Sequence, residues 1–120
     1  MSQLKLYGYA ASRAVRNLWM CEELGLSYEH VAMTTADGAT RTPAFLKTNP
    51  AGHIPAIDDG GFTLSESLAI NLYLAKKHGG PLAPRDLRED AIATQWSLWV
   101  MTEVEKTLLQ ALFHRTGLLG

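Results

Sequence analysis

The hydrophobic and polar positions of residues 1–80 predict strands and helices in alternation. Residues 3–8 alternate apolar and polar side chains and end at a glycine, which predicts a strand. Ser12 is expected to cap a helix that stops near Gly25. Residues 27–32 predict a second strand, so the strand–helix–strand order implies a parallel pair with a right-handed connection. The apolar face of the helix is expected to consist of Ala14, Val15, Leu18, Trp19 and Cys21.

The pattern then changes to a strand–strand–helix order. A polar loop and a short helix at residues 43–47 precede two short strands, at residues 55–57 and 62–64, that an Asp-Asp-Gly-Gly turn joins. Ser65 is expected to cap a further helix that ends at Gly79. Its apolar face is expected to consist of Leu68, Ala69, Leu72 and Tyr73.

This order of elements predicts an α/β domain at residues 1–80, with a four-stranded mixed sheet and helices on its faces. Residues 81–88 contain two prolines and predict a linker. Residues 89–120 predict a long helix with one apolar face, which includes Trp96 and Trp99. Such a helix needs partner helices, so we expect it to be the first helix of an all-α domain that is not completed here. Core or subunit-interface packing is the expected role of the two tryptophans.

Composition narrows the class of protein. The chain has 120 residues, of which 47% are hydrophobic and 19% charged, and this excludes disordered and collagen-like chains. The formal net charge of −1 lacks the basic excess of a nucleic-acid surface. No apolar run of eighteen residues is present, so we expect no membrane span. The N-terminal residues lack the apolar stretch of a secretory signal, which favours a cytoplasmic location.

The single cysteine, Cys21, cannot form an intrachain disulfide, which fits a reducing compartment. It also excludes a thiol-rich zinc site. Because Cys21 is on the apolar face of the first predicted helix, we expect a buried structural thiol. The four histidines are scattered without metal-ligand spacing, so no metal site is predicted.

Three local features could bind a ligand, and each has an ordinary structural alternative. If the Ile54–Pro55 bond is cis, the Ile54 backbone can pair with an extended peptide; the alternative is a trans proline at a strand start. Glu66 and Ser67, at a helix start, could bind a ligand ammonium and carboxylate, or could serve only as capping residues. Ser12 could donate to a ligand thiolate, or could only cap its helix.

The available energies are sufficient for the Ser12 role. Lowering a thiol pKa by two units requires about 2.7 kcal/mol. A hydrogen bond to a charged group contributes about 1.5–3 kcal/mol, and a helix N-terminus adds about 0.3–1 kcal/mol. A single hydroxyl at a helix start could therefore activate a bound thiol.

Together these features resemble the glutathione transferase family, whose N-terminal domain has a thioredoxin-like fold. The resemblance covers residues 4–78 and then the opening of the family's all-helical domain, and it is strongest to bacterial and plant serine-type members. The matching stretches are residues 12–16, 22–29, 45–55 and 64–74. The last two, in this order, are specific to the family.

The resemblance implies a role for each candidate residue. Ile54, next to a cis Pro55, would pair with the cysteinyl part of glutathione. Glu66 and Ser67 would bind the γ-glutamyl ammonium and carboxylate. His53 would lie near the glycyl end, where Lys47 and Arg41 are weaker candidates for its carboxylate.

The catalytic position departs from the family pattern. The usual serine or cysteine is five residues before Arg16, and Ala11 occupies that position here. Two readings are open: Ser12 takes over thiolate activation, or backbone N–H groups provide it alone. Tyr7 and Tyr9 are similar to the catalytic residue of tyrosine-type members but rank below Ser12.

The resemblance implies a detoxifying transferase that joins the glutathione thiolate to an apolar electrophile, with glutathione as substrate and with no cofactor. A homodimer is also expected. The alternative is a non-catalytic module that binds glutathione or a protein partner.

Overall fold

The computed structural model describes residues 3–117, and the chain divides into two compact units, residues 1–83 and 84–120. The first two residues of the predicted α/β domain and the last three of the predicted long helix lie outside the described residues. The boundary between the units falls within the stretch that the sequence marks as a linker.

The first unit contains one mixed sheet of four strands in the order β2-β1-β3-β4. Strand β1 pairs in parallel with β2 and antiparallel with β3, and β3 pairs antiparallel with β4. This confirms the predicted strand–helix–strand unit followed by a hairpin and a helix. The elements are β1 (Leu4–Tyr7), α1 (Val15–Glu23), β2 (Glu29–Val31), η1 (Ala39–Arg41), α2 (Pro43–Thr48), β3 (Ala56–Asp59), β4 (Phe62–Ser65) and α3 (Ser67–His78).

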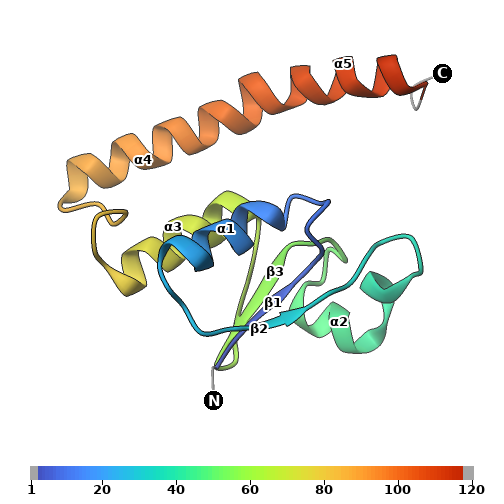
Figure 1. The fold of residues 1–120 in the computed structure, drawn as a ribbon, viewed down its shortest axis with the longest axis horizontal. Coiled ribbons are helices and arrows are strands. Elements are labelled where there is room, and N and C mark those ends of the chain that lie inside the picture. Colours follow the sequence, from blue (N-terminus) through green and yellow to red (C-terminus); the bar gives the residue numbers. More distant parts are fainter. Residues whose placement is uncertain (1–2, 118–120) are drawn as a thin grey trace. The chain divides into compact units, whose positions relative to one another are not determined.

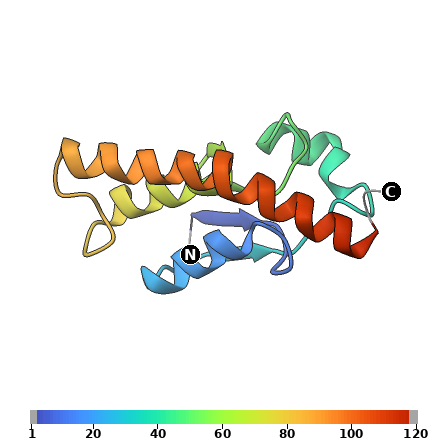
Figure 2. The same ribbon diagram turned by 90° about the horizontal axis from the view of Figure 1, so that it is seen from above.

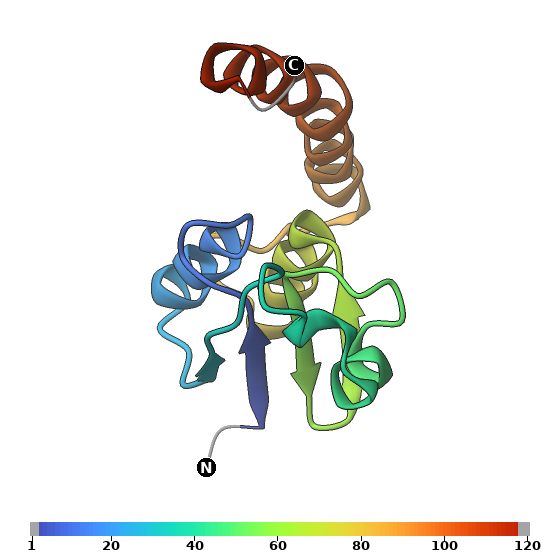
Figure 3. The same ribbon diagram turned by 90° about the vertical axis from the view of Figure 1, so that its right-hand side faces the viewer.

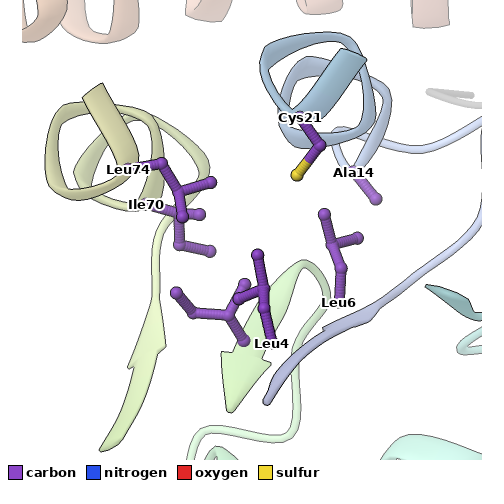
Figure 4. Close-up of a cluster of buried hydrophobic side chains, with 7 residues drawn as sticks. Leu4, Leu6, Ala14, Cys21, Ile70 and Leu74 are labelled. Atoms are coloured by element: carbon purple, nitrogen blue, oxygen red, sulfur yellow. The ribbon is translucent and has the colours of Figure 1, made fainter. Parts of the chain in front are cut away.

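Helices α1 and α3 lie side by side on one face of the sheet, and α2 lies on the other face (Figures 1 and 3). The alternation in β1 explains both layers. Leu4 and Leu6 are buried, whereas Tyr7 meets the ring of Phe45 in α2 edge-on, at 5.7 Å between ring centroids. The main core lies between the sheet and the α1/α3 layer (Figure 4). Its buried members are Leu4, Leu6, Ala14, Cys21, Ile57, Ile70 and Leu74.

The predicted apolar faces of α1 and α3 are only partly correct. Cys21 is buried as expected, but Trp19 is 68% exposed and Val15 is 46% exposed. In α3 the residues that reach the core are Ile70 and Leu74, which are four positions apart and therefore share one face. Of the predicted α3 face, Tyr73 packs against the core but Leu68 does not, because the helix is apolar on more than one side. The surplus apolar side chains include Trp19 and Leu68, which line an open groove of about 360 Å³ in the first unit.

The second unit is one continuous helical rod (Figure 2). It consists of α4 (Leu87–Trp99), a π-helical segment η2 (Val100–Glu105) and α5 (Lys106–Thr116). Helix α4 begins two residues before the predicted start, because the Asp86 carboxylate accepts from the Glu89 N–H at 2.9 Å and caps the first turn.

None of the residues in these three segments is buried. Trp96 and Trp99 contact each other edge-on, with ring centroids 5.4 Å apart, and are about half exposed. Of the two expected roles, core packing is therefore not seen within residues 3–117, and subunit-interface packing stays a prediction. Among residues 3–117, no helix combines the length and the apolar character needed to cross a bilayer.

Candidate functional site

The end of β1, the start of β3 and the end of β4 lie at one edge of the sheet (Figure 3). The predicted site residues are close to these ends in the sequence. Tyr7, the last residue of β1, lies opposite Ala56, the first residue of β3. Ala56 also lies opposite Ser65, the last residue of β4. Because neighbouring strands are about 4.8 Å apart, the segments that leave this edge are close in space. These segments lead to Ser12, to Ile54–Pro55 and to Glu66–Ser67.

Ser12 lies in a turn before α1 and not at the helix cap itself. Its N–H donates to the Tyr9 carbonyl at 3.0 Å, and its Oγ accepts from the Ala14 N–H at 3.1 Å. Ala14, not Ser12, is the residue that precedes the first residue of α1. The Ser12 hydroxyl also donates to the Tyr9 carbonyl, with 2.7 Å between the oxygens. The hydroxyl must therefore turn away from Tyr9 before it can donate to a ligand.

Gly8 lies close to both the Ser12 turn and the Ile54 segment. A Cβ built on Gly8 would lie 2.5 Å from the Ala14 Cβ, 3.7 Å from the Ile54 Cβ and 3.8 Å from the Ser12 Oγ. Its φ of +142° is one that residues with a side chain rarely adopt. The close packing of Gly8 against Ala14 therefore depends on a glycine, and the Ser12 turn and the Ile54 side chain both lie near this position.

The Ile54 backbone is available for pairing. The Ile54–Pro55 bond is cis. Within residues 3–117, neither the N–H nor the carbonyl of Ile54 has a hydrogen-bond partner. An extended peptide could use both groups, as a strand added to a sheet does.

The loop before Ile54 is fixed by Asn49, a residue that the sequence analysis did not single out. Asn49 is buried; its Nδ2 donates to the His53 carbonyl at 2.8 Å and its Oδ1 accepts from the Ala51 N–H at 3.1 Å. The His53 side chain is exposed. Of the two weaker candidates, Arg41 reaches the Ala51 carbonyl of this loop at 3.4 Å, whereas Lys47 is in the last turn of α2.

Glu66 and Ser67 form the N-terminus of α3. Glu66 is exposed and precedes the helix, with a φ of +72° and a ψ of 112°. Glu66, not Ser65, precedes the first residue of α3, and within residues 3–117 its side chain makes no capping hydrogen bond, so the predicted capping role of Ser65 was wrong. The first intrahelical bond in this region joins the Ile70 N–H to the Glu66 carbonyl at 2.9 Å. Within residues 3–117 the earlier N–H groups of the first turn have no partner, so they can bind an anion, which the helix dipole favours.

Two residues of α1 that were not predicted as site residues hold Ser67 in place. The Arg16 Nη1 donates to the Ser67 Oγ at 3.0 Å. The Asn17 Nδ2 donates to the Ser67 carbonyl and to the Asn71 Oδ1, both at 2.7 Å. Asn17 is fully buried, so a polar residue on the core-facing side of the helix, one turn before Cys21, was the signal available in the sequence.

Cys21, predicted as a structural thiol, and the two tyrosines ranked below Ser12 differ in their surroundings. Cys21 is buried in the core, and its burial, with a smaller effect from Glu22, raises the pKa of the thiol to about 11, as expected for a structural cysteine. Tyr7 packs against Phe45, as an ordinary strand residue would. Tyr9 is 37% exposed and provides the carbonyl that holds the Ser12 hydroxyl.

Among the described residues, no group of three or more His, Cys, Asp or Glu side chains is placed to hold a metal ion. The site offers hydroxyl groups, backbone groups, the Glu66 carboxylate and the N-terminus of α3. These groups can hold a peptide that carries both an ammonium and a carboxylate.

Comparison with known proteins supports the resemblance to glutathione transferases that the sequence motifs show. The family described as glutathione S-transferase, N-terminal domain, matches residues 2–76. The chain is 37% identical to the zeta-class glutathione S-transferase of Euphorbia esula over 86% of this chain and 47% of that protein. It is 42% identical to glutathione S-transferase 3 of Zea mays over 88% of this chain and 46% of that protein.

Solved structures agree with this. The theta-class glutathione S-transferase of Xanthomonas axonopodis pv. citri with glutathione bound has a TM-score of 0.77 and 35% identity, over 86% of this chain and 50% of that one. A delta-class glutathione transferase of Nilaparvata lugens has a TM-score of 0.86 and 30% identity, over 98% of this chain and 57% of that one. The chain thus spans about half the length of the curated relatives it matches. With its α/β fold and its match over residues 2–76, the chain belongs to the glutathione S-transferase family.

Proposed function

We propose that the chain binds glutathione and joins its thiolate to an electrophilic, mostly apolar second substrate. The observation that carries the proposal is the convergence of the Ser12 turn, the Ile54 backbone and the N-terminus of α3 at one sheet edge. The relatives named above are glutathione S-transferases, and one of the similar structures has glutathione bound.

Each part of the peptide finds a complementary group. The Ile54 backbone pairs with the cysteinyl residue, since its N–H and carbonyl have no partner within residues 3–117. Glu66 binds the γ-glutamyl ammonium, while Ser67 and the first-turn N–H groups of α3 bind the carboxylate. His53 lies near the glycyl end.

In the reaction, the Ser12 hydroxyl leaves the Tyr9 carbonyl and donates to the bound sulfur. The thiol proton passes to solvent, the thiolate forms a carbon–sulfur bond with the electrophile, and the leaving group departs with the bonding electron pair. A hydrogen bond to a charged sulfur contributes about 1.5–3 kcal/mol, against about 2.7 kcal/mol for a two-unit fall in thiol pKa. The exchange of Tyr9 for sulfur reduces that net contribution, because one bond is lost as the other forms.

The hydrogen bond from Ser12 to Tyr9 favours a second candidate function, a glutathione-binding module without transferase activity. The Ser12 hydroxyl hydrogen is already engaged by Tyr9, and Ala11 occupies the usual catalytic position of the resembled members. Binding groups for the peptide would be kept, and activation of the thiol would be lost.

A binding assay and a conjugation assay separate the two functions. Glutathione affinity is measured by calorimetry, and conjugation is followed with an aryl halide for wild type, Ser12→Ala and the control Thr35→Ala, which removes an exposed loop hydroxyl. We expect binding by all three proteins and at least a tenfold slower conjugation by Ser12→Ala, in line with about 1.4 kcal/mol or more of lost stabilisation.

The outcomes are distinct. Binding without conjugation in wild type favours the module. Conjugation that Ser12→Ala leaves unchanged refutes the role of Ser12 and points to backbone N–H groups. A folded wild type that does not bind glutathione refutes both functions.

The proposal also includes a homodimer in a cytoplasmic location. The support for the dimer is the exposed apolar face of the second unit, which includes Trp96 and Trp99. Sedimentation velocity on the chain tests the dimer, and a single species at monomer mass would refute it. Fractionation of the source cells tests the location, and recovery in the membrane or secreted fraction would refute it.

A further inference from the structure

A hydrogen bond between α1 and α3 connects Arg16 to the proposed carboxylate site. The Arg16 Nη1 lies 3.0 Å from the Ser67 Oγ, although the two residues are 51 positions apart in the sequence. The Ser67 residue is only 4% exposed, so its hydroxyl has few possible partners. The contact is thus a specific one between the first helix and the start of α3.

The chemistry of this pair fixes the direction of the hydrogen bond. A guanidinium group only donates, so the Ser67 oxygen must be the acceptor. A serine hydroxyl has one hydrogen, and within residues 3–117 no group accepts it. The Ser67 hydroxyl therefore keeps a hydrogen for a ligand, in contrast to Ser12, whose hydrogen is used by Tyr9.

The surrounding amides hold both partners. The Asn17 Nδ2 donates to the Ser67 carbonyl at 2.7 Å, and the Asn71 Nδ2 donates to the Arg16 carbonyl at 3.4 Å. The backbones of Arg16 and Ser67 are thus tied to the opposite helix in each case. A displacement of the Arg16 side chain alone would leave these ties intact.

We propose that Arg16 is a positioning residue that sets the Ser67 hydroxyl as a donor and thereby makes the site selective for a ligand carboxylate. The inference rests on the proposed function, in which that carboxylate belongs to the γ-glutamyl residue of glutathione. Arg16 acts through Ser67, and its removal frees the hydroxyl to turn its hydrogen elsewhere.

The test compares two peptides on the full chain by calorimetry. One is glutathione, and the other is γ-aminobutyryl-cysteinyl-glycine, which keeps the amino group but lacks the γ-glutamyl carboxylate. Arg16→Met is expected to weaken glutathione binding about tenfold, as for the loss of a hydrogen bond to a charged group, and to change the affinity for the analogue less than twofold. The control Arg88→Met removes an exposed arginine from the second unit and is expected to change neither affinity.

A double-mutant cycle tests the route through Ser67. Ser67→Ala is expected to cause the same selective loss, and Arg16→Met in that background is expected to add almost nothing, because the hydroxyl that it positions is already absent. Additive losses, or an equal loss of both peptides, would mean that Arg16 only supports the fold, and the inference would be wrong.

A conservative variant keeps the test decisive if Arg16→Met does not fold. Arg16→Lys retains a cationic donor and is expected to keep part of the preference for glutathione over the analogue; equal loss of both peptides overturns the inference. Wild type that binds neither peptide refutes the proposed function itself. Wild type that binds both peptides equally refutes only the proposed selectivity of the site for the γ-glutamyl carboxylate.

Discussion

At the scale of single residues, conformational strain and ligand chemistry coincide at Glu66. Among residues 3–117, it is the only non-glycine residue with a positive φ, and it directly precedes the open N-terminus of α3. Such a conformation costs about 1–3 kcal/mol and persists only where the surroundings hold it in place. The exposed carboxylate of Glu66 is the group proposed to bind the glutathione ammonium, so a side chain is kept at a position that suits glycine.

Replacement of Glu66 is expected to separate stability from binding. Glu66→Gly should raise the free energy of unfolding by about 1 kcal/mol, because the relieved strain exceeds the entropy that glycine loses on folding. Glu66→Gln keeps the strain and should leave stability unchanged. Both variants should bind glutathione more weakly, since the carboxylate is gone. Urea denaturation and calorimetry measure the two effects, and a Glu66→Gly protein less stable than wild type would contradict the strain argument.

Single residues also show what the sequence could and could not reveal. The burial of Cys21 followed from its place on an apolar helix face, and the structure confirms it. The bond between Arg16 and Ser67 joins residues 51 positions apart, and no local pattern marks it. The hydrogen bond from the Ser12 hydroxyl to Tyr9 depends on the geometry of one turn, which hydrophobic periodicity does not describe.

At the scale of elements, the existence of each strand and helix was easier to predict than the face it buries. Turn residues and periodicity indicated all four strands of the sheet, and the order of elements indicated the β1–β2 and β3–β4 pairs but not the central β1–β3 pair. The faces of α1 and α3 were harder, because apolar residues such as Trp19 and Leu68 line a surface groove rather than the core. The π-helical segment η2 had no signal in the pattern, since one extra residue in a turn changes the period only slightly.

A small polar cluster fixes α3 to the β3–β4 hairpin. The Asp59 Oδ2 accepts from the Tyr73 hydroxyl at 2.7 Å and from the Lys77 ammonium. The Asp59 side chain is only 5% exposed. The hydrogen bond from Lys77, and then that from Tyr73, hold the pKa of the Asp59 carboxyl below its usual range, while desolvation opposes them.

This cluster is expected to make stability depend on pH in the acid range. Because the pKa of Asp59 is lower in the folded state, its contribution is complete above the unfolded pKa of about 3.9 and is lost as the pH falls through the folded pKa. Asp59→Asn should lose about 1–2 kcal/mol of unfolding free energy at pH 7 and show a flatter dependence below pH of about 4. Urea unfolding at several pH values measures this for wild type, Asp59→Asn and the control Asp37→Asn, in an exposed loop. Parallel pH profiles for wild type and Asp59→Asn would contradict the assignment.

At the scale of the whole molecule, the two units differ in how they are stabilised. The first unit has a core of seven buried apolar residues between a sheet and two helices, and the proposed site is formed within it. The second unit is a helix of residues 87–116 in which no residue is buried. An isolated helix is marginally stable in water, so we expect this helix to be stable only where other apolar surfaces cover its exposed face.

Hydrogen–deuterium exchange is expected to reveal this difference along the chain. The amides of residues 70–75 in α3 should exchange slowly, because they open only when the core of the first unit unfolds. Amides of residues 87–116 should exchange much faster at low protein concentration. If a second copy of the chain covers the face that includes Trp96 and Trp99, their protection should rise with concentration, whereas that of residues 70–75 should not. Equal protection of both segments in a dilute monomeric sample would show that the helix has a stability of its own and needs no covering partner.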